Sequence, residues 1–222
     1  MFAYEALVRG RANEPASAVF ASLDPSQLYQ FDRWARTRAI ALAAALGVEA
    51  SLSLNFLPKS LDALPDAVSS TIDAARAASI SLQRIILEVT ENEIIHDPGR
   101  FASMMNVYRA QGVRVAIDDF GAGYSGLNLL AEFQPDIVKL DMQLVRSIDS
   151  NGPRQAIVRA LVQACDDLGI DVLAEGVETQ AEQRWFRRVG VRLFQGYLYG
   201  RPAFEALPLP LFPAAVDALA AR

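Results

Sequence analysis

Acidic and amide side chains stand at the ends of successive apolar runs in this sequence. The residues that end these runs are Asn55, Glu88, Asp118, Asp119, Asp141 and Glu175, and one more acid, Glu5, stands near the start. Carboxylate and amide oxygens are the ligands that hard cations such as Mg²⁺ or Mn²⁺ prefer. Two such ions held close together by a shared carboxylate suit phosphodiester cleavage, because they activate water and neutralise the phosphate charge. The pattern therefore predicts a metal-dependent site.

The charges of this set also favour a bound cation. Unpaired carboxylates packed about 4 Å apart repel one another by about 4 kcal/mol per pair at an effective dielectric of 20. The whole chain has one histidine, His96, and one cysteine, Cys165, so a zinc site or a thiolate cluster is not indicated. Lys139 and Asp141 are two positions apart on one predicted strand, which places an ammonium among the acids. Such a lysine can hold a water molecule or a phosphate oxygen.

A simpler interpretation applies to each acid taken alone. An acidic residue directly after a strand is commonly the cap of the following helix. The same pattern on consecutive strands favours a shared site over a series of unrelated caps. For the adjacent pair Asp118 and Asp119, strand alternation turns one side chain inward, and we expect the strand to end there and free the other to turn the same way.

The elements that must position these residues alternate between strand and helix. Strands are predicted at 51–56, 85–89, 113–117, 137–140 and 170–174, and helices at 27–46, 61–78, 98–111, 154–168 and 179–189. This alternation implies a parallel sheet, either a closed (β/α) barrel or an open doubly wound sheet. No glycine-rich phosphate turn follows an early strand, and polar residues recur at strand ends, so we predict a TIM-like barrel with its strand ends facing one bowl.

Composition limits the remaining possibilities. The chain has 222 residues, of which 52% are hydrophobic, and we expect a single domain over 1–222, with a proline-rich segment from 203 onward that ends in a short helix. The net charge of -5 does not favour binding to a nucleic acid polymer. Neither a signal peptide nor a membrane span is predicted, so we expect a soluble, cytoplasmic protein.

Seven segments, taken in order, resemble the motifs of the EAL family of cyclic di-GMP phosphodiesterases. They are Tyr4–Arg9 (YEALVR), Leu54–Phe56 (LNF), Leu87–Glu91 (LEVTE), Asp118–Ser125 (DDFGAGYS), Lys139–Asp141 (KLD), Ala174–Thr179 (AEGVET) and Gln195–Tyr197 (QGY). Together these motifs are highly specific, and they are spread over nearly the whole length of the chain.

The resemblance implies a TIM-like barrel that hydrolyses cyclic di-GMP to linear pGpG with two Mg²⁺ or Mn²⁺ ions. By motif position, one ion would be held by Glu5, Asn55, Glu88 and Asp118, and the second by Asp118, Asp119 and Glu175. Lys139 and Asp141 would order the attacking water. Glu175 could instead act as the general base, and the sequence leaves both roles open.

The resemblance also assigns residues around the site. Substrate contacts are implied for Leu7, Arg9, Gln195 and Pro202. Glu91 and Glu178 are implied to anchor the loop from Phe120 to Leu127. It further implies a homodimer and a sensor domain beyond these residues. A catalytically weak cyclic di-GMP receptor and a dimerising regulatory output module are the alternatives to an active enzyme.

The chain departs from the family pattern at a few positions. Ala122 stands where a threonine is usual, Gly126 where a serine is frequent, and Gly10 where a tryptophan is frequent. None of these changes removes a metal ligand. Only a short segment precedes Glu5, so we expect the family's usual first strand, which carries a Gln-Pro-Ile segment, to be missing.

Overall fold

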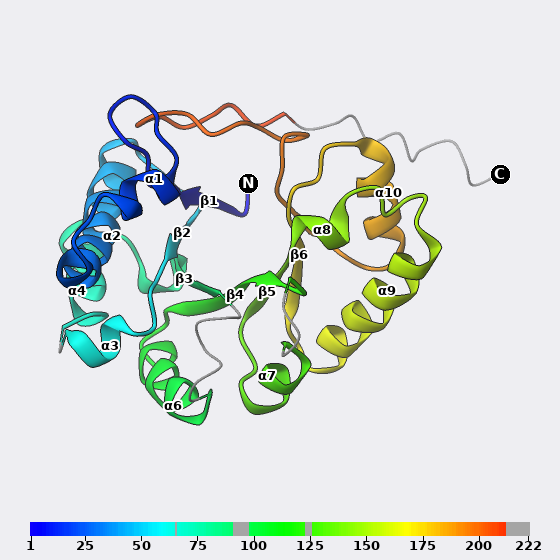
Figure 1. The fold of residues 1–222 in the computed structure, drawn as a ribbon, viewed down its shortest axis with the longest axis horizontal. Coiled ribbons are helices and arrows are strands. Elements are labelled where there is room, and N and C mark those ends of the chain that lie inside the picture. The colour runs from blue at the N-terminus through cyan, green and yellow to red at the C-terminus, as the bar shows by residue number, and fades with distance from the viewer. Residues whose placement is uncertain (65, 91–97, 123–125, 212–222) are drawn as a thin grey trace.

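The strands of this protein form one parallel sheet that curls around a central axis (Figure 1). The computed structural model describes residues 1–64, 66–90, 98–122 and 126–211. Its strands are β1 (Ala3–Ala6), β2 (Ser51–Asn55), β3 (Ile85–Thr90), β4 (Arg114–Phe120), β5 (Ile137–Leu140), β6 (Asp171–Ala174) and β7 (Leu193–Phe194). They pair strictly in sequence order. Because a doubly wound sheet reverses its order at a switch point, this order confirms the predicted barrel type.

The helices lie outside the curled sheet (Figure 1). They are α1 (Ala16–Ala21), α2 (Leu28–Ala45), α3 (Ser60–Ala63), α4 (Ser69–Ala77), α6 (Pro98–Arg109), α7 (Gly126–Glu132), α8 (Met142–Val145), α9 (Gly152–Asp167) and α10 (Gln180–Arg188), with short 3-10 turns η1 (Pro25–Gln27) and η2 (Leu82–Arg84). Among these described helices, none is both long enough and apolar enough to cross a bilayer. The helix predicted near the C-terminus lies outside the described residues.

Two sequence predictions of elements were wrong. The single helix predicted over 61–78 is two helices, because Leu64 takes an extended conformation at the end of α3 and precedes Pro65, which disfavours a helical residue before it. Strands β1 and β7 were not predicted. Strand β1 is only partly buried and lacks a run of large apolar residues, and β7 has two residues, too few to show a period.

Strands β1 and β7 form the two edges of the sheet. The part of the chain that the structure describes supplies seven strands, one fewer than a closed (β/α)8 barrel, in agreement with the expected missing first strand. The larger apolar core lies between the sheet and the surrounding helices and includes Ile40, Phe56, Leu87, Val138 and Phe186.

A second, smaller apolar cluster fills the inside of the barrel. It consists of Ile86, Ala116, Ile137 and Leu173, against which Phe2, Ala3 and Leu193 pack. Since side chains on a strand repeat on one face every second residue, the residues two positions further along each strand also point inward. This apolar cluster therefore forms the floor of a bowl at the carboxyl ends of the strands.

Candidate active site

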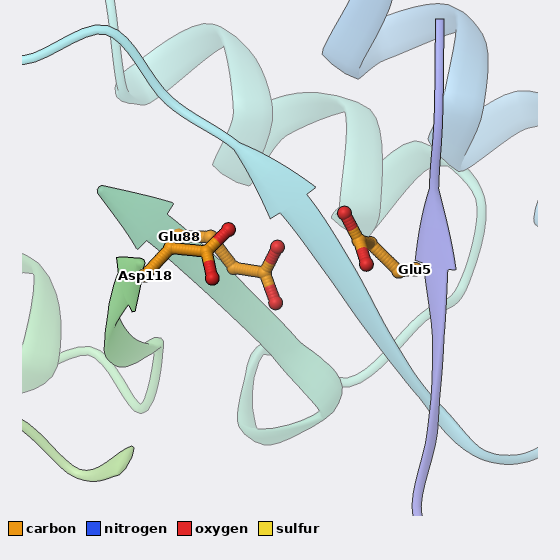
Figure 2. Close-up of side chains that lie close together, drawn as sticks. All are labelled: Glu5, Glu88 and Asp118. Carbon is orange, nitrogen blue, oxygen red and sulfur yellow. The ribbon is translucent and has the colours of Figure 1, made fainter. Parts of the chain in front are cut away.

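The side chains directly above this floor are those that the sequence singles out. Two residues beyond the floor positions lie Glu5, Glu88, Asp118, Lys139, Glu175 and Gln195. They come from or directly follow β1, β3, β4, β5, β6 and β7, so the period of two places them in one layer. Figure 2 shows the carboxylates of Glu5, Glu88 and Asp118 turned toward a common space above β2.

The acids of the bowl form two groups that share one member. Oxygens of Glu5, Glu88 and Asp118 all lie within 4.8 Å of one another, and so do oxygens of Asp118, Asp119 and Glu175. Asp118 belongs to both groups. The two groups contain the acidic members of the two ligand sets that the resemblance implies, and Asp118 is a member of both sets.

A β-bulge turns Asp119 toward the bowl. Strand β4 continues to Phe120, so the expected strand end at Ile117 is wrong. Asp119 has a φ of +53°, and the register between β4 and β5 shifts between Ile117 and Phe120. An extra residue at a bulge re-aims the side chains beside it, so two adjacent acids reach the same site within a continuous strand.

Lys139 lies beneath the carboxylates and contacts both groups. Its Nζ atom lies 3.0 Å from Asp118, 3.1 Å from Glu88, 3.6 Å from Glu175 and 3.7 Å from Glu5, and the side chain is 1% exposed. Burial alone would lower the pKa of Lys139, but the attraction of the four carboxylates holds that pKa well above its usual value. The bowl therefore contains a permanent positive charge, as the sequence predicts.

One ammonium does not neutralise the acids around it. Burial raises the pKa of Glu88 to about 7 and that of Glu175 to about 8, although Lys139 acts in the opposite direction. Burial also raises the pKa of Asp119, and the charges of Asp118 and Asp141 add to this effect. Each raised pKa therefore reflects burial first, and the neighbouring carboxylates add to it.

The donor set fits hard divalent cations. One carboxylate oxygen of Glu88 and one of Glu175 are buried and accept no hydrogen bond within the described part of the chain. All members of the two groups are oxygen donors, which is the chemistry that Mg²⁺, Mn²⁺ and Ca²⁺ share. A cation at either group would supply the positive charge that the bowl lacks.

Two amide side chains, those of Asn55 and Gln195, hold the Glu5 carboxylate on β1. The Asn55 Nδ2 atom donates to Glu5 across 3.4 Å, and the Gln195 Nε2 atom donates to the other Glu5 oxygen across 2.5 Å. The second bond joins the two edges of the sheet. The backbone of Gln195 is held by hydrogen bonds to Ala174 and Val177, and at the next residue, Gly196, a Cβ atom would lie 2.2 Å from the carbonyl oxygen of Val177, so only glycine fits.

Asp141 is both a helix cap and a neighbour of the site. It is buried, and its Oδ1 atom accepts a hydrogen bond from the backbone of Gln143 at the start of α8. The simpler interpretation of an acid after a strand therefore applies to this residue. Its charge nevertheless contributes to the raised pKa of Asp119, so the carboxylate lies close to the second acidic group.

The remaining predicted residues lie further from the bowl or outside the described residues. The Arg9 guanidinium donates to the carbonyl oxygen of Val8, and Leu7 and Pro202 are exposed. Glu178 forms an ion pair of 2.8 Å with Arg146. Glu91 lies outside the described residues.

Ser53 is a site residue that the sequence analysis missed. Its Oγ atom donates to Glu88 Oε1 across 2.5 Å, and both side chains are buried. The signal was the alternation of Ser51, Ser53 and Asn55 with leucines along β2, which places polar groups on the inner face. A buried hydroxyl on that face must find a partner, and Glu88 is the acid on the adjacent strand.

The fold and the site together agree with one known family. The family model described as the EAL domain matches residues 1–202. The chain belongs to the EAL domain family. The name-giving Glu5, Ala6 and Leu7 of this EAL domain lie at the end of β1, where Glu5 enters the first acidic group.

Relatives of this EAL domain differ in their described roles. The blue light- and temperature-regulated antirepressor BluF of Escherichia coli is 35% identical over 96% of this chain, which spans 53% of that protein. The probable cyclic di-GMP phosphodiesterase PdeD of the same organism is 36% identical over 60% of this chain and 24% of its own length. The chain thus spans about half or less of the length of these curated relatives.

A solved relative contains the two components that the site chemistry suggests. The manganese and cyclic di-GMP complex of Klebsiella pneumoniae BlrP1 superposes with a TM-score of 0.88 and is 43% identical, covering 94% of this chain and 54% of BlrP1. Related EAL proteins therefore bind divalent metal and this dinucleotide, and the acidic groups described above fit such a metal.

Proposed function

We propose that this EAL domain hydrolyses cyclic di-GMP to linear pGpG with the help of two Mg²⁺ or Mn²⁺ ions. The observation that carries the proposal is the pair of carboxylate groups that share Asp118 above the buried ammonium of Lys139. The manganese and cyclic di-GMP complex of BlrP1 supports the choice of substrate and metal. The similarity to PdeD supports the reaction type.

The ligand sets follow from the two groups. Glu5, Asn55, Glu88 and Asp118 would hold one ion, and Asp118, Asp119 and Glu175 the other. When bound, such ions lower the pKa of a coordinated water and neutralise charge on the phosphate. Ser53 and Gln195 would orient Glu88 and Glu5 through their hydrogen bonds.

Glu175, Lys139 and Asp141 are the residues proposed to handle the attacking water and its proton. Attack of water forms a bond from the water oxygen to phosphorus and breaks one bond between phosphorus and a ribose oxygen. The water gives up a proton, and the released ribose oxygen takes up a proton to become a hydroxyl. In the alternative role, in which Glu175 is not a ligand of the second ion, its carboxylate would accept the proton of the water as the general base. The ammonium of Lys139 would hold the water or a phosphate oxygen in place, and the carboxylate of Asp141 would accept a hydrogen bond from the water. Leu7, Arg9, Gln195 and Pro202 are proposed substrate contacts, and Glu91 and Glu178 proposed loop anchors.

Incubation of the protein with cyclic di-GMP and Mg²⁺ or Mn²⁺ should yield pGpG, and Glu175→Gln should bind the dinucleotide but turn it over at least about 10²-fold more slowly. The amide keeps the size of the side chain but cannot accept the proton. Chromatographic separation of pGpG measures turnover, and calorimetry measures binding. The exposed Glu49→Gln is the control and should match the wild type. Absence of product from the wild type with both metals would overturn the proposal.

A second candidate is a regulatory module that binds cyclic di-GMP without fast turnover. The observation that favours it is the similarity to BluF, an antirepressor, over nearly the whole chain. Such a module would act as a homodimer under the control of a sensor segment. Sedimentation velocity with and without cyclic di-GMP tests this candidate, because a monomer in both conditions would exclude ligand-coupled dimerisation. Metal-independent binding without product would favour this candidate over the enzyme.

A further inference from the structure

A buried ion pair lies behind the strand that carries Asn55. Asp32 and Arg36 are one turn apart on α2 and are 5% and 2% exposed. The Arg36 guanidinium donates to Asp32, to the Thr71 hydroxyl across 3.0 Å and to the Ala67 carbonyl across 2.8 Å. One guanidinium therefore joins α2 to α4 and to the segment that precedes α4.

The same pair holds the residues that follow Asn55. The Arg36 guanidinium carbon lies 4.8 Å from the centre of the Phe56 ring, and the Leu57 backbone lies close enough to the Asp32 carboxylate to lower its pKa. The Phe56 amide donates to the carbonyl oxygen of Glu88 across 2.8 Å. Phe56 thus lies between the ion pair and two members of the first proposed metal group.

The energetic cost of this pair argues that stability is not its main contribution. Burial raises the pKa of Asp32 although Arg36 acts in the opposite direction, so the charged carboxylate is held against its desolvation penalty. Apolar replacements of a buried ion pair are often as stable as the pair itself. The planar Arg36 guanidinium has donors in a fixed geometry. The pair therefore orients the Phe56 ring and the Leu57 backbone relative to each other.

We propose that Asp32 and Arg36 are positioning residues for the metal site. They fix the segment after β2 so that Asn55 and, through Phe56, the end of β3 with Glu88 keep the geometry required for the first ion. This inference rests on the proposed function, because it concerns the same metal group. Neither residue touches the acids directly, so their effect passes through Phe56 and Leu57.

A neighbouring ion pair provides the matched control. Arg33 on the same helix binds Asp66 at 2.6 Å, and the two side chains are 37% and 49% exposed. This pair joins α2 to the segment between α3 and α4, as the Arg36 pair does. The contact it makes is with Asp66 and not with the residues after Asn55, so Arg33→Met removes a comparable connection between helices without loosening that segment.

Arg36→Met should weaken Mn²⁺ binding by about tenfold, the lower end of the effect of removing a partner that orients a ligand. Calorimetric titration of the substrate-free protein with MnCl₂ measures this affinity. Hydrogen exchange should also rise in the peptide over 52–60, which contains the Leu57 amide. Arg33→Met should change neither quantity by more than about twofold, because the segment after β2 stays fixed.

Two further variants keep the proposal falsifiable if Arg36→Met does not fold. Arg36→Lys keeps the charge opposite Asp32 but cannot make the same fork of donors, and Phe56→Leu keeps the ion pair but removes the ring. Both should weaken Mn²⁺ binding by several-fold. Folded variants with wild-type Mn²⁺ affinity and exchange would overturn the inference. Wild-type protein that binds Mn²⁺ but makes no pGpG would instead contradict the proposed function.

Discussion

Asp118→Asn is expected to lower the rate of cyclic di-GMP hydrolysis by about 10³-fold or more, which corresponds to about 4 kcal/mol of transition-state stabilisation. Of the described acidic residues, Asp118 alone belongs to both carboxylate groups. Loss of its charge therefore weakens both proposed ions at once, whereas Glu5→Gln removes a ligand from one group only. Calorimetric titration with MnCl₂ should show fewer ions bound at micromolar metal, and product formation should fall with it.

The folded state should tolerate this change. Asparagine has the size of aspartate, and the bowl has more carboxylates than its single ammonium can balance, so removing one negative charge relieves repulsion. In EDTA the melting temperature of Asp118→Asn should equal or exceed that of the wild type. Asp73→Asn, an exposed change on α4, is the control and should keep full activity. More than about a tenth of wild-type turnover in Asp118→Asn would contradict the bridging role.

The positions of site residues on or directly after a regular strand could be predicted from the sequence. Glu88, Lys139 and Glu175 lie on or directly after β3, β5 and β6, which the apolar runs predict, and a parallel barrel brings the carboxyl ends of such strands together. Their grouping is therefore a consequence of chain pattern and topology. The shared position of Asp118 was implied by the family motif and agrees with the distances among the carboxylates.

Features that depend on irregular backbone or on contacts between distant residues could not be predicted from the sequence. The bulge that turns Asp119 inward replaces a predicted strand end, and no local residue preference announces it. The Asp32 and Arg36 pair contacts residues about thirty positions away, so its partners became visible only in the fold. The helical periodicity over 61–78 predicts one helix, but Pro65 disfavours a helical conformation at Leu64 and ends α3 there.

The amount of charge that Lys139 compensates in the bowl should depend on whether a metal ion is bound. In the absence of metal, Lys139 is the one described cation within ion-pair distance of Glu5, Glu88, Asp118 and Glu175. A bound divalent ion would take over part of this compensation. The contribution of Lys139 to stability should therefore depend on metal and on pH, and its replacement separates the two effects.

Lys139→Met should destabilise the protein in EDTA by about 3–5 kcal/mol, the usual cost of removing one partner from a buried ion pair. Methionine fills the space of the lysine stem but leaves the carboxylates without their ammonium. Saturating MnCl₂ should recover a large part of the loss, because the ions supply positive charge at the same place. Urea unfolding followed by circular dichroism measures both free energies. Lys59→Met, at an exposed loop position, is the control and should unfold like the wild type.

The loss in Lys139→Met should also grow with pH in EDTA. Glu88 and Glu175 have folded-state pKa values of about 7 and about 8, above the ordinary value of 4.5, so their burial is tolerated below pH 4.5 and opposes folding as pH rises through those values. Without the ammonium both pKa values rise further. The free energy of unfolding of the variant should therefore fall more steeply than that of the wild type between pH 5.5 and 8.5. Equal slopes, or an EDTA loss that MnCl₂ leaves unchanged, would show that Lys139 does not balance these carboxylates.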